Sequence, residues 1–245
     1  ERAMSALALV LARSVVVLTG GYRDKHVAYF SCFKRPEKVV VIANGIDVAR
    51  YRRAAPRPPA HMVRIGMAAR FTDTKRQDLL VSALALLVRH QPEVNWRLSL
   101  AGDGVCHAQV KALVSRLGLG NHVELMGNLD QADLVSWFQS LDFYAHASEG
   151  EALSTAMLQA MSMELPIVAS AVPGISNLLM QGERQFGLLA KENTPEAFAD
   201  VIRLLQSNPD LQTRFMADAR DLVIRLYNNE TMFESYNNLV QGSRN

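Results

Sequence analysis

The chain has 245 residues, of which 49% are hydrophobic and 20% charged, and this composition excludes a disordered or fibrous protein. With 26 basic and 24 acidic residues the net charge is +2, which gives no reason to expect a nucleic-acid partner. Two cysteines are too few for a disulfide scaffold and suit a reducing compartment, so we expect a cytoplasmic protein, and no apolar run reaches the roughly 18 residues of a membrane span.

The N-terminal part alternates between helix-forming and β-branched segments. Residues 1–43 are predicted to form a helix, a strand, a helix and a strand in that order: 2–12, 14–19, 22–32 and 38–42. Asn44-Gly45 marks a turn, and the three prolines within residues 51–62 mark a linker. The sequence starts at Glu1, inside the first predicted helix, so we expect it to be a piece of a longer protein.

Residues 63–206 repeat a strand-then-helix pattern. The apolar strands are predicted at 63–68, 96–101, 123–126, 143–147, 166–170 and 187–189. The helices are predicted at 77–90, 108–117, 130–139, 155–163, 175–180 and 195–206. Tandem β–α units with apolar strands predict an α/β fold, a Rossmann-like parallel sheet with helices on both faces. Residues 209–240 are predicted to be helical and to lie on the surface.

In an open parallel sheet, ligands bind beyond the carboxyl ends of the strands, so the loops that follow the strands are the candidate sites. The richest of them lies within residues 147–166, where two carboxylates follow a strand and Ser154 or Thr155 caps a helix that could hold a phosphate. If Glu151 and Gln159 flank this helix, the helical rise separates them by roughly 12 Å, which suits the two ends of a sugar nucleotide. A capped core helix with solvated carboxylates is the alternative.

A second candidate loop contains Arg70 and Lys75, which lie five residues apart before a helix. Two cations at this spacing suit a diphosphate, and a solvated basic loop is the alternative. Gly102 and Gly104 form a tight turn after the next strand, but the third glycine of the dinucleotide fingerprint is absent, so NAD binding is not indicated. The six histidines show no metal-ligand spacing, and we expect His146, at the end of a strand, to line the cleft.

The order of these motifs resembles that of a known family. In chain order they are Asn44-Gly-Ile-Asp47, Arg70 with Lys75, Ala101-Gly-Asp-Gly104, Met126-Gly127, Glu151 to Gln159-Ala-Met161 and Leu165-Pro-Ile-Val168. They resemble glycosyltransferase family 4, or glycosyltransferases group 1, which are retaining enzymes of the GT-B fold. The resemblance implies the carboxyl-terminal, donor-binding half of that fold with a small remnant of the amino-terminal domain.

The resemblance also implies a division of the chain into four parts. Residues 1–43 would be the remnant of the amino-terminal acceptor domain and residues 44–62 a linker. Residues 63–225 would form the nucleotide-sugar donor-binding domain, and residues 226–245 a helix that crosses back toward the other domain. The rest of the amino-terminal domain would then be a partner that supplies the acceptor site.

The resemblance implies a role for each matching residue. Arg70, Lys75 and Glu151 would be catalytic, the two cations on the donor diphosphate and the carboxylate on the sugar hydroxyls. The implied donor-binding residues are Gly102, Gly104, Met126, Gly127, Leu153, Ser154, Thr155 and Gln159. A UDP- or GDP-linked hexose would be the donor, and a glycan or lipid of a lipopolysaccharide or other cell-surface polysaccharide the acceptor. A lipid acceptor would bring the protein to the inner face of the membrane. No cofactor or bound metal is implied.

Several residues depart from the family pattern. Gln159 replaces a carboxylate that binds the ribose, Ala69 and Ser154 replace glycines, and Glu164 stands where a glycine precedes Leu-Pro. These changes leave alternatives to a hexosyltransferase open. One is a degenerate or non-catalytic nucleotide-sugar-binding fragment, and another is a GT-B-type sugar-nucleotide epimerase.

Overall fold

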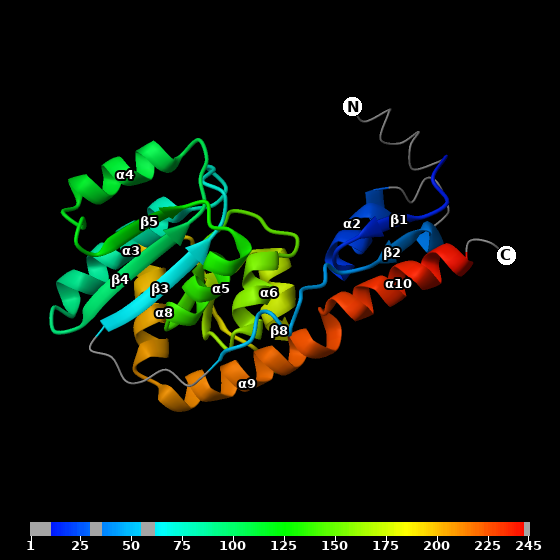
Figure 1. The fold of residues 1–245 in the computed structure, drawn as a ribbon. Coiled ribbons are helices and arrows are strands. Elements are labelled where there is room, and N and C mark those ends of the chain that lie inside the picture. Colours follow the sequence, from blue (N-terminus) through cyan, green and yellow to red (C-terminus); the bar gives the residue numbers. More distant parts are fainter. Residues whose placement is uncertain (1–10, 30–35, 55–61, 243–245) are drawn as a thin grey trace.

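The computed structural model describes residues 11–29, 36–54 and 62–242, which form two units of unequal size (Figure 1). The predicted helix at 2–12 lies outside the described residues except for its last two positions, and so do the prolines of the predicted linker. None of the described helices is both long and apolar enough to cross a membrane.

The smaller unit is built on a two-stranded parallel sheet. β1 (Val15–Val17) pairs with β2 (Val39–Val41), and α2 (Gly20–Tyr29) lies between them in the chain. Both strands are runs of three valines, whose β-branched side chains favour extended backbone. The predicted order of strand, helix and strand is confirmed, with shorter strands and a helix that begins two residues earlier than expected.

The larger unit contains a six-stranded sheet in which all paired strands are parallel. In chain order the strands are β3 (Met62–Ala68), β4 (Asn95–Ala101), β5 (Val123–Gly127), β6 (Phe143–His146), β7 (Ile167–Ser170) and β10 (Leu188–Ala190). Their order across the sheet is β10-β7-β6-β3-β4-β5, so the direction of winding reverses between β3 and β6. In such doubly wound sheets the ligand site is expected at that reversal.

Helices cover both faces of this sheet. The core on one face includes α3 (Gln77–His90), α4 (His107–Arg116) and α8 (Pro195–Gln206). The core on the other face includes α5 (Gln131–Ser140), α6 (Thr155–Ser162), α7 (Pro173–Leu179) and α9 (Pro209–Leu226). β6 alternates between them, with Phe143 and Ala145 in the first core and Tyr144 in the second. The predicted Rossmann-like parallel sheet with helices on both faces is confirmed.

Most predicted boundaries agree with the structure within two residues, because the caps are readable in the sequence. Asp130, for example, caps α5 by accepting the N–H groups of Ala132 (2.8 Å) and Asp133 (2.9 Å). α7 begins two residues earlier than predicted, at Pro173 instead of Ile175. The hairpin of β8 (Met180–Gln181) and β9 (Arg184–Gln185) is not anticipated, since strands of two residues carry no periodicity.

The C-terminal helical segment breaks at residues 227–228 into α9 and α10 (Asn229–Gly242), and the break lies where the chain joins the two units. The N–H of Ile46 donates to the carbonyl of Tyr227 (2.8 Å), and the N–H of Asn229 donates to the carbonyl of Ile46 (3.1 Å). A Cβ at Gly45 would lie 2.5 Å from the carbonyl oxygen of Asn228, so glycine permits this approach. α9 lies along the larger unit and α10 lies along the smaller one (Figure 1). The division into domains at residues 43, 62 and 225 stays a prediction.

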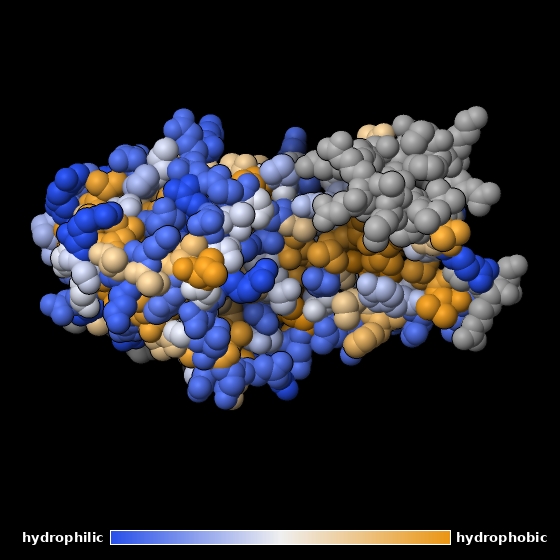
Figure 2. Space-filling model, turned by 90° about the horizontal axis from the view of Figure 1, so that it is seen from above, coloured by the Kyte–Doolittle hydropathy of each residue, from blue (hydrophilic) through white to orange (hydrophobic). Residues whose placement is uncertain are grey.

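The two units also touch through α2 and α7, where a Cβ at Gly21 would lie 2.8 Å from Nδ2 of Asn177. Their surfaces differ in character. Figure 2 shows hydrophobic residues gathered toward the end of the molecule that carries the smaller unit, whereas the larger unit is mostly hydrophilic on this face. Phe233 and Val240 of α10 contribute to the exposed apolar surface, at 59% and 53% exposure.

Glu164 follows α6 with a φ of 55°, a left-handed conformation that favours glycine. An ion pair with Arg220 (Oε1 to Nε, 3.5 Å) offsets part of this strain. We expect Glu164→Gly to raise the free energy of unfolding by about 1 kcal/mol, because relief of the strain outweighs a partly exposed ion pair. Glu164→Ala keeps a Cβ at positive φ and loses the ion pair, so it should lower the free energy of unfolding. Urea unfolding of both variants measures this, and an alanine variant more stable than the glycine variant would contradict it.

Candidate active site

The loops after β3 and β6 leave the sheet side by side at the reversal of strand order. β3 pairs with β6 through Ile65 opposite Phe143 and Gly66 opposite Tyr144. The segments that follow the two strands therefore rise at the same carboxyl edge of the sheet. These two segments contain the cations and the carboxylate that the sequence singles out as catalytic.

The carbonyl of Thr74 ties these two loops together. It accepts the N–H of Glu149 (2.9 Å) and lies 3.1 Å from the hydroxyl of Ser148. Ser148 is fully buried, and its own N–H donates to Oγ of Ser170 at the end of β7 (2.9 Å). These hydrogen bonds fix the residue after Thr74, which is Lys75, opposite the second loop.

Lys75 and Glu151 form an ion pair in which the side chains are only 20% and 15% exposed. Oε2 of Glu151 also lies 3.1 Å from Nε2 of His146, whose side chain is 1% exposed. The structure thus brings Lys75 and Glu151 together. It places His146 at the end of β6 as predicted, but the imidazole is buried behind Glu151 instead of lining an open cleft.

The tautomer of His146 follows from its partners. A carboxylate can only accept, so Nε2 of His146 carries the proton and donates it to Glu151. Nδ1 then has a free lone pair that faces the hydroxyl of Tyr144 at 3.2 Å, and this hydroxyl has a second acceptor in the carbonyl of Ala68 at 3.3 Å. The Tyr144 oxygen in turn lies 3.4 Å from the N–H of Ala68 on β3. A chain of hydrogen bonds therefore connects the backbone of β3 with the carboxylate of Glu151.

The surroundings of this cluster fix its charges. Burial alone would raise the pKa of Glu151, but hydrogen bonds from His146 and Lys75 and the charge of Lys75 outweigh it and hold the pKa at about 2. Burial lowers the pKa of His146 despite its hydrogen bond to Glu151, and the nearby Lys75 charge adds to the lowering. At neutral pH the carboxylate is therefore charged and the imidazole neutral.

Arg70, the other predicted catalytic cation, does not join the ion pair. It is exposed, and its guanidinium forms no hydrogen bond or ion pair with any residue that the structure describes. Its carbonyl accepts Nε2 of the buried Gln77 (3.1 Å), which fixes the backbone at the start of the loop. The side chain is thus available to a ligand at this edge of the sheet.

Gly102 and Gly104 bring the loop after β4 against the loop after β3. A Cβ at Gly102 would lie 2.1 Å from the carbonyl oxygen of Ala69. A Cβ at Gly104 would lie 2.4 Å from the carbonyl oxygen of Phe71. The N–H of Gly102 donates to the carbonyl of Gly127, the last residue of β5 (2.7 Å), beside the 40% exposed Met126. These predicted donor-binding residues hold three loops together at the carboxyl edge.

The N-terminus of α6 is capped and still offers free N–H groups. Oγ of Ser154 accepts the N–H of Met157 (3.3 Å), which confirms Ser154 as the N-cap. The N–H groups of Leu153, Ser154 and Thr155 find no acceptor among the described residues. Free N–H groups at a helix N-terminus attract anions, so these three can contribute to an anion site.

Gln159 does not flank α6, contrary to the expectation. The helix begins at Thr155, so Gln159 lies within it and Glu151 lies in the preceding loop. The separation of roughly 12 Å assumed helical rise over all eight residues, and that premise is wrong because half of them are not helical. The side chain of Gln159 hydrogen-bonds the hydroxyl of Tyr51, which is buried.

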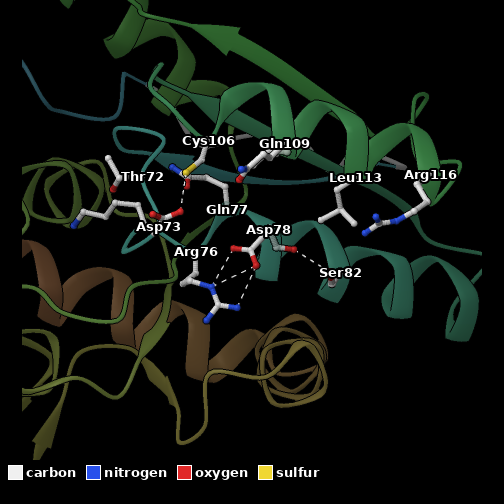
Figure 3. A pocket seen from close by; sticks show the side chains of 12 residues that line it. Thr72, Asp73, Arg76, Gln77, Asp78, Ser82, Cys106, Gln109, Leu113 and Arg116 are labelled. Carbon is white, nitrogen blue, oxygen red and sulfur yellow. Dashed lines mark hydrogen bonds and ion pairs between the residues drawn. The ribbon is translucent and has the colours of Figure 1, made fainter.

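A polar pocket of about 450 Å³ adjoins this site between α3 and α4 (Figure 3). The guanidinium of Arg76 binds the carboxylate of Asp78 (3.1 Å), and it also pairs with Glu149. The thiol of Cys106 donates to Asp73 (3.1 Å). Arg76 is thus shared between two carboxylates, and Asp73 is held by the neutral thiol of Cys106, so each of these groups already has a partner within the pocket.

Sequence reasoning missed several residues that shape the site. Tyr144 lies two residues before His146 on one strand and so shares its face, which is a signal that the sequence does contain. Gly174 at the start of α7 supports Glu151 from behind, since a Cβ there would lie 1.9 Å from the Glu151 carbonyl oxygen. Thr74 acts through its backbone carbonyl, which every residue has, so the residue type could not have revealed this role.

The described residues contain no group of three or more His, Cys, Asp or Glu side chains placed to hold a metal ion.

The fold and this edge of the sheet define a doubly wound α/β protein whose candidate site lies at the switch point. The family model named "Glycosyl transferases group 1" matches residues 53–222. The chain therefore belongs to this glycosyltransferase family. The match spans the six strands of the large sheet and most of α9.

Curated relatives of this chain include two D-inositol 3-phosphate glycosyltransferases. The one from Jonesia denitrificans is 25% identical over 227 residues, which cover 86% of this chain and 53% of the relative. The one from Kineococcus radiotolerans is 31% identical over 207 residues, which cover 75% of this chain and 47% of the relative. The chain thus spans about half the length of the curated relatives it matches.

Solved structures with the same fold include two ligand complexes. Anabaena HepE in complex with UDP and glucose superposes with a TM-score of 0.82 at 22% identity, over 98% of this chain and 66% of that one. A variant of S. aureus TarM in complex with Fondaparinux, alpha-GlcNAc-glycerol and UDP gives a TM-score of 0.81 at 23% identity, over 97% of this chain and 46% of that one. At these identities the likeness establishes the fold.

The contact between Gly174 and Glu151 predicts a sharp difference between two glycines. Gly174→Ala forces the backbone at residues 151–152 to move, so we expect a loss of about 1–3 kcal/mol in the free energy of unfolding. A Cβ at Gly150 would have no atom within 4 Å, and Gly150→Ala should change the stability by no more than about 0.5 kcal/mol. Urea unfolding of both variants tests this, and equal effects would contradict the contact.

The lowered pKa of His146 predicts a pH dependence of stability. An unfolded imidazole binds a proton near pH 6.5, whereas buried His146 does so only at lower pH, so falling pH favours the unfolded state. We expect the free energy of unfolding to fall between about pH 7.5 and about pH 5, with His146 contributing at most about 1.4 kcal/mol per pH unit. His146→Gln should remove this contribution.

The groups that face His146 are Tyr144 on its own strand, Lys75 from the loop after β3 and Glu151 from the loop after β6. The Glu151 contribution is complete above pH 4.5 and is lost only as the pH falls toward 2, so it lies outside the window. Urea unfolding at each pH, for the wild type and His146→Gln, measures the difference, in which the other five histidines cancel. Parallel pH curves would show that the imidazole titrates normally.

Proposed function

We propose that the whole protein transfers a hexose from a nucleotide diphosphate sugar to a glycan or lipid acceptor, with retention at the anomeric carbon. The observation that carries the proposal is the Lys75–Glu151 pair at the switch point of the sheet. Membership of the glycosyltransferase family supports it, as do the curated relatives that are glycosyltransferases and the structural neighbours that hold UDP.

The donor diphosphate would bind where positive groups converge. Lys75 and Arg70 lie in one loop, and the free N–H groups of Leu153, Ser154 and Thr155 lie in the neighbouring one. Charge accumulates on the diphosphate as the bond to the sugar breaks, so fixed cations and amide dipoles stabilise the transition state more than the ground state. In this proposal the protein's own cations neutralise the leaving group, and no cofactor takes part.

Glu151 would bind the sugar. With a pKa of about 2 it stays ionised at neutral pH, and a carboxylate accepts strong hydrogen bonds from hydroxyl groups. Gly102, Gly104 and the segment at Met126–Gly127 would contact the nucleoside part of the donor. Gln159 would join them by exchanging its hydrogen bond with Tyr51 for one with the donor. UDP and GDP are the nucleotides to test, since nothing in the described loops selects the base.

Two alternatives differ in the products that they predict. A nucleotide-sugar-binding fragment or degenerate family member would bind a nucleotide without transferring sugar. An epimerase would release an altered sugar without any acceptor. A lipid acceptor would place the transferase at the inner face of a membrane, whereas a soluble glycan would not.

Lys75→Ala tests the proposed function. Loss of one fixed cation at the diphosphate should lower the rate of transfer by about 100-fold or more while the protein stays folded. Lys111→Ala, which removes an exposed lysine of α4, is the matched control and should leave the rate unchanged. Both are measured in the whole protein by release of UDP or GDP from the sugar nucleotide in the presence of acceptor.

Calorimetry with UDP and GDP completes the test. Binding without turnover in the wild type would favour the binding fragment, and product without acceptor would favour the epimerase. Full activity of Lys75→Ala would overturn the assignment of the diphosphate site. A wild type that binds neither nucleotide would overturn the proposed function as a whole.

A further inference from the structure

We propose that His146 is a positioning residue that holds one oxygen of Glu151 in place while the other oxygen receives the donor sugar. The inference rests on the proposed function and deepens it, because it assigns separate tasks to the two carboxylate oxygens. It also assigns a role in sugar binding to a buried side chain that touches no ligand itself.

The two partners of Glu151 bind the same oxygen. Nζ of Lys75 and Nε2 of His146 both contact Oε2. No described residue hydrogen-bonds Oε1, although the side chain as a whole is only 15% exposed. One oxygen of the carboxylate is therefore held from the protein side, and the other is available at the carboxyl edge of the sheet.

The two partners differ in their freedom to move. Lys75 carries its charge on a flexible four-carbon chain, so its ammonium can shift from the carboxylate to a diphosphate bound at the same edge. His146 is 1% exposed and is held by Tyr144, which is itself fully buried and lies against the backbone of β3. When Lys75 turns to the diphosphate, His146 is the described partner that remains on Oε2.

This division of tasks has a consequence for affinity. Without the imidazole, Glu151 would lose its fixed orientation at the moment when Lys75 leaves it. Contacts to the sugar would then weaken, whereas contacts between Lys75 and the diphosphate would not. A structural role of His146 in the core would instead weaken both kinds of contact together.

The test compares a nucleoside diphosphate with its sugar-bearing form, using UDP with UDP-glucose and GDP with GDP-mannose. Binding is measured by calorimetry in the whole protein. We expect His146→Leu to weaken the sugar nucleotide at least about tenfold, the size expected for loss of an oriented hydrogen bond to a charged group, and to leave the affinity for the diphosphate within about threefold. His146→Gln, whose amide can donate at the same position, should recover most of the loss.

A double-variant cycle shows whether His146 acts through Glu151. In a Glu151→Gln background, His146→Leu should have little further effect on the sugar nucleotide, because the group that it positions is no longer a carboxylate. His122→Leu is the matched control, since His122 precedes β5, an edge strand that does not neighbour β6, and its Nδ1 contacts the carbonyl of Trp96 (3.0 Å). This control should leave both affinities unchanged.

Each outcome either supports or overturns the inference that His146 positions Glu151. Equal weakening of diphosphate and sugar nucleotide by His146→Leu, or no weakening of either, would overturn the inference while leaving the proposed function intact. If the leucine variant does not fold, His146→Gln and Tyr144→Phe carry the test, the latter with an expected severalfold loss confined to the sugar nucleotide; unchanged affinities in Tyr144→Phe would then overturn the inference. If the wild type binds none of the four compounds, the proposed function is overturned, and the inference that rests on it is overturned as well.

Discussion

The parallel pairing of β3 with β6 is the constraint on which the rest of the site depends. Strand order reverses at this pair, so the two crossover connections leave in opposite directions and open a space above the carboxyl edge. Lys75 and Glu151, 76 residues apart in the chain, meet there because each follows one of the paired strands. The carbonyl of Thr74 then fixes how far each loop reaches. A shift of this pairing by one residue would turn Tyr144 and His146 to the other face of the sheet and separate the carboxylate from both of its partners.

Burial of so many polar groups would be costly if any of them lacked a partner. Along the line from Ala68 through Tyr144 and His146 to Glu151, each donor meets an acceptor, so the desolvation is offset and the geometry is fixed. At the end of this line, Lys75 forms an ion pair with Glu151. In the proposed transferase, this arrangement would hold the carboxylate from the protein side and leave Lys75 for the charged leaving group.

Much of the fold could be predicted from the sequence, because its information is local. Capping residues such as Asp130 and β-branched runs such as Val39–Val41 mark where elements begin and end. That Lys75 and Glu151 lie in loops at the carboxyl edge followed from the general geometry of parallel sheets, whereas their ion pair is seen only in the structure. What could not be predicted depends on backbone atoms and on close contacts, as with the Thr74 carbonyl and the space that Gly174 leaves. The position of Gln159 was misjudged for a related reason, since the number of residues between two side chains gives a distance only once the helix start is known.

The short helix α7 connects features that otherwise look independent. One of its ends lies against the backbone of Glu151 through Gly174, and its middle lies against α2 of the smaller unit near Asn177. The smaller unit is joined to the larger one by the paired strand-like contact of Ile46 with residues 227–229. α7 therefore contacts both the smaller unit and the backbone that carries the carboxylate. The packing of α2 against α7 and the packing of α7 against Glu151 share one short helix, so a substitution in α7 acts on both contacts.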